Sequence, residues 1–176
     1  MTNKKTIAVD MDDVLSDDEQ QYSNWYARET GKRISKADMS GKPEKEALPD
    51  KTAVERYLKT PGFFRDIPVM EGAVDAIQRL QQQYDIYIVT SAFDYPHSLT
   101  EKYQWLKQYF PFIEEKYLVF CGSKDIIATD YMIDDKVSNL EGCQARGILF
   151  SAGHNVGQAY EPRVNSWKEA VDLLLP

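Results

Sequence analysis

The chain has 176 residues and a formal net charge of −7, and 43% of its residues are hydrophobic. This length and composition predict one globular domain that buries roughly 70% of the surface of the unfolded chain, so its stability requires no disulfide or structural metal. The acidic balance and the absence of a basic stripe argue against a protein that binds the phosphates of a nucleic acid polymer.

The sequence also argues against a membrane or secreted protein. No apolar run approaches the roughly 20 residues that span a bilayer, and residues 1–5 lead into an apolar segment without a signal-peptide pattern. Cys121 and Cys143 lack the spacing and the histidine neighbours of a zinc site, so we expect reduced thiols. These features together predict a cytoplasmic protein.

Short β-branched and apolar segments alternate with segments of helical periodicity along most of the chain. The predicted strands are residues 5–9, 85–89, 117–120, 131–133 and 147–150. The predicted helices between and after them are residues 72–82, 99–110, 137–145 and a last helix that follows Ser166 as its N-cap. In the helix at 99–110 we assign Tyr103, Leu106 and Phe110 to the apolar face. This alternation predicts an α/β fold with a parallel sheet.

One long segment interrupts the alternation. Residues 14–68 contain predicted helices at 22–29 and 52–58 but no core strand. Roughly 50 residues is far too long for an ordinary connection between a strand and a helix. We therefore predict an α/β core of residues 1–13 and 69–176, with residues 14–68 forming a small helical cap inserted after the first strand.

Polar side chains follow four of the predicted strands. They are Asp10 with Asp12, Thr90 with Ser91, Lys124, and Asp134 with Asp135. Ligands of open α/β sheets bind beyond the carboxyl ends of the strands, so we expect these side chains to meet. Closely packed carboxylates need a compensating cation, and oxygen ligands suit Mg²⁺. A lysine and a hydroxyl could then hold phosphoryl oxygens, which predicts a magnesium-dependent phosphate site.

Each of these residues also has a structural explanation. An Asp-x-Asp pair is common on solvated loops, and Asp134 or Asp135 could cap a helix. Thr90 and Ser91 could simply end a strand, and Lys124 could be a surface lysine. Their joint occurrence at successive strand ends favours chemistry. The acidic pair after Lys124 does not suit the order of residues in a response-regulator receiver.

The sequence resembles the haloacid dehalogenase superfamily over essentially its whole length. Asp10-Met11-Asp12-Asp13-Val14-Leu15 resembles its first motif, Thr90 the second, Lys124 the third and Asp134-Asp135 the fourth. Within that superfamily the chain resembles the 5′(3′)-deoxyribonucleotidases, through residues 63–64, 72–74, 101–110 and 133–135 and the tail pieces 154–155 and 165–167. The resemblance implies a three-layer, Rossmann-like parallel sheet with a small helical cap.

The resemblance also implies roles for individual residues. Asp10 would be the nucleophile that forms an aspartyl-phosphate, and Asp12 would be the general acid and base. Thr90, Ser91 and Lys124 would hold the phosphate. The Mg²⁺ ligands would be Asp10, the backbone carbonyl of Asp12 and one of Asp134 or Asp135, and both members of that last pair stay candidates.

Several positions depart from the family pattern. Asp13 stands where a glycine is usual, Asp17 and Asp18 replace an expected aromatic residue, and Asp94 and Gly122 replace basic residues. The leading hypothesis is a magnesium-dependent phosphomonoesterase of nucleotide metabolism that acts on (deoxy)nucleoside monophosphates. The alternatives are a phosphatase of a small phosphate such as a sugar phosphate, and a non-catalytic protein that binds a phosphorylated ligand.

The aromatic side chains of the predicted cap have two interpretations. They could stack on a nucleobase or form the small core of the cap, and helical spacing favours the core. The residues concerned are Tyr22, Trp25, Tyr26, Tyr57, Phe63 and Phe64. His97 and His154 have no partner pattern, and we assign them no catalytic role.

Overall fold

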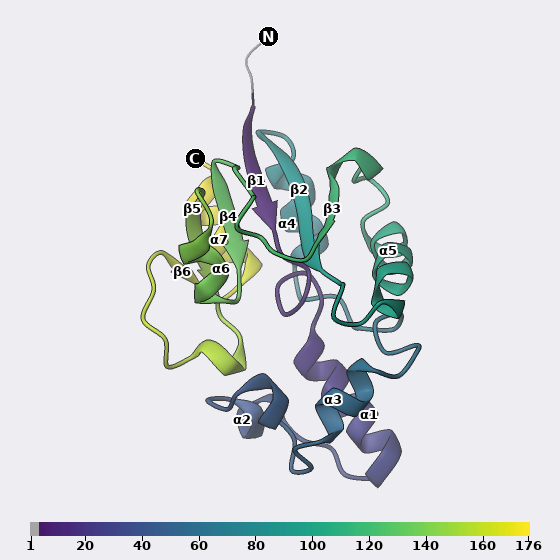
Figure 1. Cartoon of the computed structure of the whole chain (residues 1–176). Coiled ribbons are helices and arrows are strands. Elements are labelled where there is room, and N and C mark those ends of the chain that lie inside the picture. Colours follow the sequence, from purple (N-terminus) through teal and green to yellow (C-terminus); the bar gives the residue numbers. More distant parts are fainter. Residues whose placement is uncertain (1–3) are drawn as a thin grey trace.

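The computed structural model describes residues 4–176, and the strands within that range form one six-stranded parallel sheet. The strand order is β3-β2-β1-β4-β5-β6, as Figure 1 shows in part. The strands are β1 (Lys5–Val9), β2 (Tyr84–Ser91), β3 (Leu118–Cys121), β4 (Tyr131–Asp134), β5 (Arg146–Phe150) and β6 (Arg163–Val164). The predicted α/β fold is therefore confirmed. The edge strand β6 was not predicted, because two residues are too few for a strand pattern.

The helices agree with the predicted positions to within a few residues, with one addition. They are α1 (Asp18–Thr30), α2 (Lys36–Met39), α3 (Ala53–Leu58), α4 (Ala73–Leu80), α5 (His97–Tyr109), α6 (Val137–Gly142) and α7 (Trp167–Leu174). Ser166 caps α7 by accepting a hydrogen bond from the Glu169 amide, as predicted. The short helix α2 was missed, although Ser35 and Asp38 form a capping box at its start. No helix in residues 4–176 is both long and apolar enough to cross a membrane.

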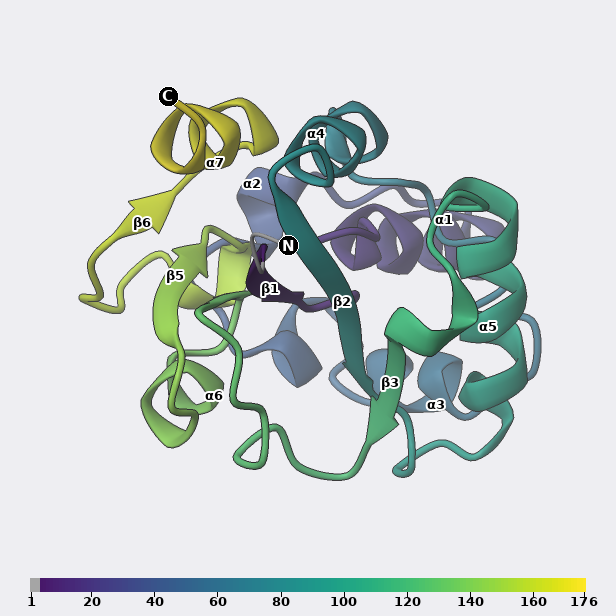
Figure 2. The same ribbon diagram turned by 90° about the horizontal axis from the view of Figure 1, so that it is seen from above.

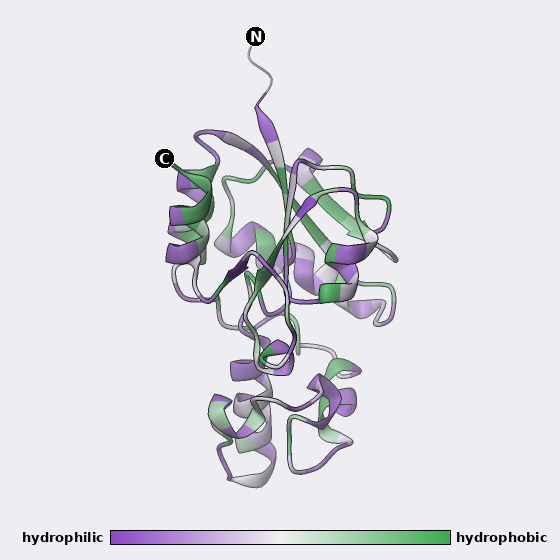
Figure 3. Ribbon diagram, turned by 90° about the vertical axis from the view of Figure 1, so that its left-hand side faces the viewer, coloured by the Kyte–Doolittle hydropathy of each residue, from purple (hydrophilic) through white to green (hydrophobic). Residues whose placement is uncertain are grey.

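Alternate residues of β1 face two separate hydrophobic layers. Ile7 and Val9 pack in a cluster with α4, α5 and α7, whereas Ala8 packs in a second cluster that includes Leu140 of α6. Figure 2 shows α4 and α7 on one side of the sheet and α6 on the other. In Figure 3 the strands are largely hydrophobic, and α7 has a hydrophobic side toward the sheet. The sheet is thus buried on both faces, as parallel sheets are.

The strand order places a topological switch point at the middle of the sheet. Strand β1 pairs with β2 on one side and with β4 on the other, in parallel register with both. The connections therefore leave the sheet in opposite directions beyond the carboxyl ends of β1 and β4, which opens a crevice there. The helices α1 and α3 lie beyond the same ends of the strands (Figure 1).

The segment between β1 and α4 has a hydrophobic cluster of its own. Phe63 lies at its centre, with a relative exposure of 0%, stacked on Tyr22 and edge-on to Trp25. These side chains are therefore packed against one another, which favours the packing interpretation of the aromatic residues. Phe64 of the same cluster lies at its boundary with α5, where its ring is 5.2 Å from the Lys102 ammonium nitrogen.

Helix α5 buries Leu106, and the chain buries Phe110 just after it, as predicted, whereas Tyr103 does not face the interior. Tyr103 is 38% exposed, whereas Glu101, Lys102, Trp105 and Leu106 are buried. The buried stripe follows helical spacing, but two of its positions carry charges, which an apolar pattern does not detect. The Trp105 indole donates a hydrogen bond to the Ile67 carbonyl over 2.7 Å. This face therefore joins α5 to residues 14–68, which we call the inserted segment.

The Glu101 carboxylate is the second link between α5 and the inserted segment. It is 4% exposed and accepts hydrogen bonds from the amides of Gly62 (2.6 Å) and Phe64 (3.2 Å). Glu101→Ala leaves both amides without their acceptor, and we expect it to lower the free energy of unfolding by about 2–3 kcal/mol. Urea denaturation measures this loss. The exposed Glu114→Ala is the matched control, expected to change it by less than about 0.5 kcal/mol. Equal losses of stability in the two variants would contradict the role of Glu101 in linking α5 to the inserted segment.

Candidate active site

The loop after β1 turns back on itself directly beyond the strand. The Asp10 amide donates to the Ile133 carbonyl of β4, and the amides of Leu15 and Ser16 both donate to the Met11 carbonyl. Asp13 has a φ of 54°, in the left-handed region. Glycine adopts this region without strain and aspartate is one of the few other residues that tolerate it. The turn therefore gives the physical reason why glycine is usual here and why Asp13 is an acceptable replacement.

Lys124 joins the carboxylates at the carboxyl ends of β1 and β4. Its ammonium nitrogen lies 2.6 Å from Asp10 Oδ1 and 2.7 Å from Asp134 Oδ2, and all three side chains are nearly or fully buried. Burial alone would lower the pKa of Lys124, but the carboxylates of Asp10 and Asp134 outweigh it and hold that pKa above its ordinary value. Lys124 is thus a permanent cation in this site.

Asp134 and Asp135 differ in what surrounds them. Asp134 accepts hydrogen bonds from Lys124, the Lys136 amide and the Asn139 side chain, so both of its oxygens are engaged. Asp135 Oδ1 is buried with no hydrogen-bond partner among the described residues. Burial raises the pKa of Asp135 to about 7, although the nearby His154 works in the opposite direction. Asp135 is therefore the carboxylate with one oxygen, Oδ1, that receives no hydrogen bond from a protein group within residues 4–176.

His154 lies against the acidic groups on the far side of Asp135. Its Nε2 is 3.2 Å from Asp135 Oδ2, and its Nδ1 is 4.0 Å from Asp13 Oδ2. Burial disfavours the charged imidazole, but Asp135 outweighs this effect and raises the pKa of His154 above its usual range. Burial and the neighbouring Asp18 and Asp135 raise the pKa of the Asp13 carboxyl. His154, to which the sequence analysis assigned no role, therefore contributes to the charge balance of the site.

Asp12 and Thr90 meet at a lysine that the sequence analysis missed. The Lys102 ammonium of α5 donates to Asp12 Oδ2 (2.5 Å), to Thr90 Oγ1 (3.0 Å) and to the Ser91 carbonyl (3.1 Å). Lys102 is 2% exposed. The signal that could have identified it is a lysine on the buried stripe of α5, four residues before Leu106 and three before Trp105. The Ser91 side chain, by contrast, is exposed and lines a small cavity beside Asp12.

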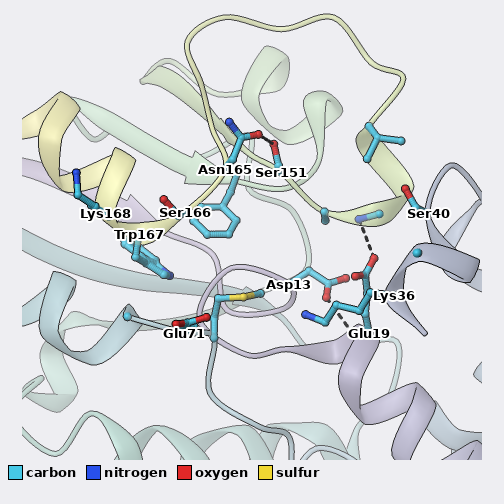
Figure 4. Close-up of a pocket in the computed structure, with 17 residues that line it drawn as sticks. Asp13, Glu19, Lys36, Ser40, Glu71, Ser151, Asn165, Ser166, Trp167 and Lys168 are labelled. Carbon is cyan, nitrogen blue, oxygen red and sulfur yellow. Dashed lines mark hydrogen bonds between the residues drawn. The ribbon is translucent and has the colours of Figure 1, made fainter. Parts of the chain in front are cut away.

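Two cavities adjoin this set of residues. The smaller, of about 170 Å³, is lined by Asp12, Ser91 and Lys102 of the site and by Phe64 and Tyr95. The larger, of about 600 Å³, lies between α1, α2 and the start of α7. Figure 4 shows that Asp13, Glu19 and Lys36 lie together in the larger cavity. Asp10, Asp12, Thr90 and Lys124 do not line it, so the smaller cavity is the one that adjoins the candidate chemistry.

The structure brings most of the predicted site residues to one edge of the sheet. Asp10 and Asp134 share Lys124, Asp12 and Thr90 share Lys102, and carboxylate oxygens of Asp10, Asp134 and Asp135 lie within 4.8 Å of one another.

A family model decides the relationship of this chain to known proteins. Residues 4–176 match the family described as 5′ nucleotidase, deoxy (pyrimidine), cytosolic type C protein (NT5C). The chain belongs to this family. The match spans the sheet, the inserted segment and all of the site residues.

Individual relatives agree with the family. A 5′(3′)-deoxyribonucleotidase of Bacillus subtilis strain 168 is 38% identical over 181 residues, which cover 98% of this chain and 99% of that protein. A Staphylococcus epidermidis protein, provisionally named a 5′(3′)-deoxyribonucleotidase, is 40% identical over 167 residues, or 94% and 93% of the two chains.

The fold is also that of known haloacid dehalogenase structures. A family hydrolase of Deinococcus radiodurans, solved with bound phosphate and sodium, gives a TM-score of 0.62 at 14% identity and covers 100% of both chains. A hydrolase of Bacillus subtilis bound to magnesium gives a TM-score of 0.60 at 15% identity, covering 99% and 100%. The predicted superfamily and fold are thus confirmed, as is the enzyme class, a phosphoric monoester hydrolase.

The contrast between Asp135 and Asp134 yields a prediction about stability. In Asp135 the folded-state pKa of about 7 exceeds the ordinary value of about 4, so the folded protein binds the extra proton and loses stability as pH rises between these values. Asp135→Asn removes this buried ionisable group. In EDTA at pH 8 we expect this variant to melt about 2–8 °C above the parent protein, with a smaller difference at pH 5.

Asp134→Asn is the matched control for this measurement. It weakens a partner of the buried Lys124 ammonium, so we expect a lower melting temperature than the parent protein at both pH values. Thermal unfolding followed by circular dichroism reports both variants. A lower melting temperature for Asp135→Asn than for Asp134→Asn at pH 8 would contradict the stated difference between the two carboxylates.

Proposed function

We propose that this protein is a magnesium-dependent phosphatase that hydrolyses deoxynucleoside monophosphates through an aspartyl-phosphate on Asp10. The observation that carries the proposal is the convergence of Asp10, Asp12, Thr90 and Lys124 at one edge of the sheet, in a chain of the deoxyribonucleotidase family. The family's description as cytosolic supports a reaction in the cytoplasm.

In the first half of the reaction Asp10 attacks the phosphorus atom of the substrate. Asp10 Oδ1 is held by the Met11 amide (2.7 Å) and by Lys124 (2.6 Å), so Oδ2 is the oxygen available for attack. A bond forms between Oδ2 and phosphorus, and the bond from phosphorus to the sugar oxygen breaks. Asp12 donates its proton to that departing oxygen, which leaves as the hydroxyl group of the nucleoside.

In the second half a water molecule attacks the same phosphorus atom. Asp12, now a carboxylate, accepts a proton from the water, and the bond between Asp10 Oδ2 and phosphorus breaks to release inorganic phosphate. The enzyme returns to its starting state with Asp10 ionised and Asp12 protonated. Lys124 and the Thr90 hydroxyl hold the phosphoryl oxygens through both halves, because each can donate hydrogen bonds to them.

The residues present fit a bound Mg²⁺. The test is Asp135 Oδ1, a buried acidic oxygen without a protein partner, beside the carboxylates of Asp10 and Asp134. We propose Asp10, the backbone carbonyl of Asp12 and Asp135 as the ligands, with Asp134 orienting Lys124 instead. The ion would supply positive charge to the carboxylates and to the phosphoryl oxygens, which Mg²⁺ commonly binds in such sites.

We propose further that residues 14–68 act as a cap that covers the leaving group. The support is the cavity of about 170 Å³ beside Asp12, whose lining includes Phe64 from this segment and Tyr95 from the core. Tyr95 is partly exposed and offers aromatic surface to a base, and the centroid of the buried Phe64 ring lies 6.2 Å from that of Tyr95. Asp94, which stands where the resemblance leads us to expect a basic residue, also lines this cavity, together with Asp18, Glu44, Lys45 and Lys136.

Phosphate release from deoxyribonucleotides, ribonucleotides and sugar phosphates, with Mg²⁺ and with EDTA, tests the proposal. We expect release that requires Mg²⁺, prefers deoxynucleotides and falls at least about a thousandfold in Asp10→Asn. Asp172→Asn, at the distant end of α7, is the matched control and should keep full activity.

Other outcomes of this panel favour the alternatives. A preference for sugar phosphates would replace the proposed substrate class while keeping the chemistry. Ligand-dependent thermal stabilisation without phosphate release would favour a binding protein. Undiminished release by Asp10→Asn would contradict the covalent mechanism.

A further inference from the structure

Lys102 stands apart from the four motifs that the family shares, yet it contacts residues of two of them. It projects from α5, outside the strand ends, and its ammonium nitrogen reaches Asp12 Oδ2, Thr90 Oγ1 and the Ser91 carbonyl. At 2% exposure it is as buried as Lys124. Burying a lysine is unfavourable unless its charge is paired. The contacts of Lys102 therefore stabilise it in this position, and we ask what they do for Asp12 and Thr90.

The contact with Asp12 makes the two oxygens of that carboxyl group different. An ammonium group can only donate hydrogen bonds, so Asp12 Oδ2 is fixed as an acceptor. Asp12 Oδ1 is buried and has no hydrogen-bond partner in the part of the chain that the structure describes. Because Lys102 occupies Oδ2, Oδ1 is the oxygen on which Asp12 can carry a proton.

The same logic applies to Thr90. Because Oγ1 accepts a hydrogen bond from Lys102, the hydroxyl proton must point elsewhere. Within residues 4–176 that hydroxyl donates to no other group, and Thr90 is 1% exposed. Lys102 thus directs the free proton of Thr90 away from α5, and leaves it for a phosphoryl oxygen.

Lys102 is also held by the inserted segment. The ring of Phe64 lies 5.2 Å from its ammonium nitrogen, and the Phe64 amide donates to Glu101, the residue that precedes Lys102. The cation and the aromatic ring attract each other, which helps to hold the Lys102 ammonium beside Asp12. The orientation of Asp12 is therefore tied to the seating of the segment over α5.

We propose that Lys102 is the positioning residue of the general acid: it holds Asp12 so that the proton on Oδ1 reaches the leaving-group oxygen. This inference rests on the proposed function, because it assigns to Asp12 the protonation of the leaving group. It predicts a specific kind of defect. Substrates whose leaving group needs a proton depend strongly on Lys102, whereas substrates whose leaving group is a stable anion depend on it only through the contact with Thr90.

The test compares Lys102→Met with the parent protein on deoxynucleoside monophosphates and on aryl phosphates of graded leaving-group acidity, including p-nitrophenyl phosphate. The quantity compared is kcat/KM, which covers events up to departure of the leaving group. For deoxynucleotides we expect a fall of about 100-fold, the lower range of general acid catalysis, and for p-nitrophenyl phosphate about fivefold or less. The dependence on leaving-group acidity becomes steeper in the variant.

Two further variants separate positioning from a purely structural role. In the Asp12→Asn background, Lys102→Met should lower kcat/KM by less than about threefold, because the group through which Lys102 acts is already lost. Lys107→Met, an exposed lysine on the same helix, should match the parent protein on every substrate. If melting curves show that Lys102→Met is unfolded, Lys102→Gln provides the same comparison with an uncharged side chain.

The outcomes distinguish this inference from the proposed function. Equal losses for deoxynucleotides and p-nitrophenyl phosphate, or a full further loss in the Asp12→Asn background, would overturn the role of Lys102 while leaving the phosphatase intact. Unchanged activity of Lys102→Met on every substrate would overturn it as well. A parent protein that releases phosphate from no substrate would overturn the proposed function, and the positioning role with it.

Discussion

The buried ion pairs of Lys124 with Asp10 and Asp134 are the constraint on which the site depends. The two carboxylates follow neighbouring strands, β1 and β4, so the sheet order brings them together whatever their charges. Burying two like charges is unfavourable unless a cation lies between them. Lys124, in the loop after β3, is that cation. The lysine cannot neutralise Asp135 as well. The divalent cation proposed for the site would add positive charge beside these carboxylates.

Helix α5 supplies the second constraint, because it connects the inserted segment to the chemistry. Consecutive residues of this helix serve the two sides: Glu101 holds the backbone of the segment and Lys102 holds Asp12 and Thr90. A shift of residues 62–64 relative to α5 would therefore change the position of the Asp12 carboxyl group. This connection explains why two charged residues occupy a stripe that would otherwise be apolar.

The sequence predicts the sheet and the strand-end residues because both depend on local patterns. Most core strands are apolar runs that stop at a polar residue, and parallel strands place those ends at one edge. The contacts of Lys102 and His154 depend on the packing of distant elements instead. Lys102 is one of many lysines on helices, and only its helical phase relative to Trp105 and Leu106 marks it as buried.

Sequence reasoning left both Asp134 and Asp135 as candidate metal ligands, for a related physical reason. The two residues are adjacent, and only the folded structure shows that Asp134 is surrounded by donors while Asp135 Oδ1 has none. Asp13 is a different case, because its φ of 54° gives the reason why a glycine is usual at this position.

The most direct test of the account is to trap the phosphorylated enzyme. An Asp12→Asn variant treated with p-nitrophenyl phosphate should form the aspartyl-phosphate without needing the acid, yet hydrolyse it slowly for want of the base. Acid quench, proteolysis and mass spectrometry should then place one phosphoryl group, labile to hydroxylamine, on the peptide that contains Asp10. A quenched enzyme without a phosphoryl group, or with one that persists after Asp10→Asn is added, would contradict the account.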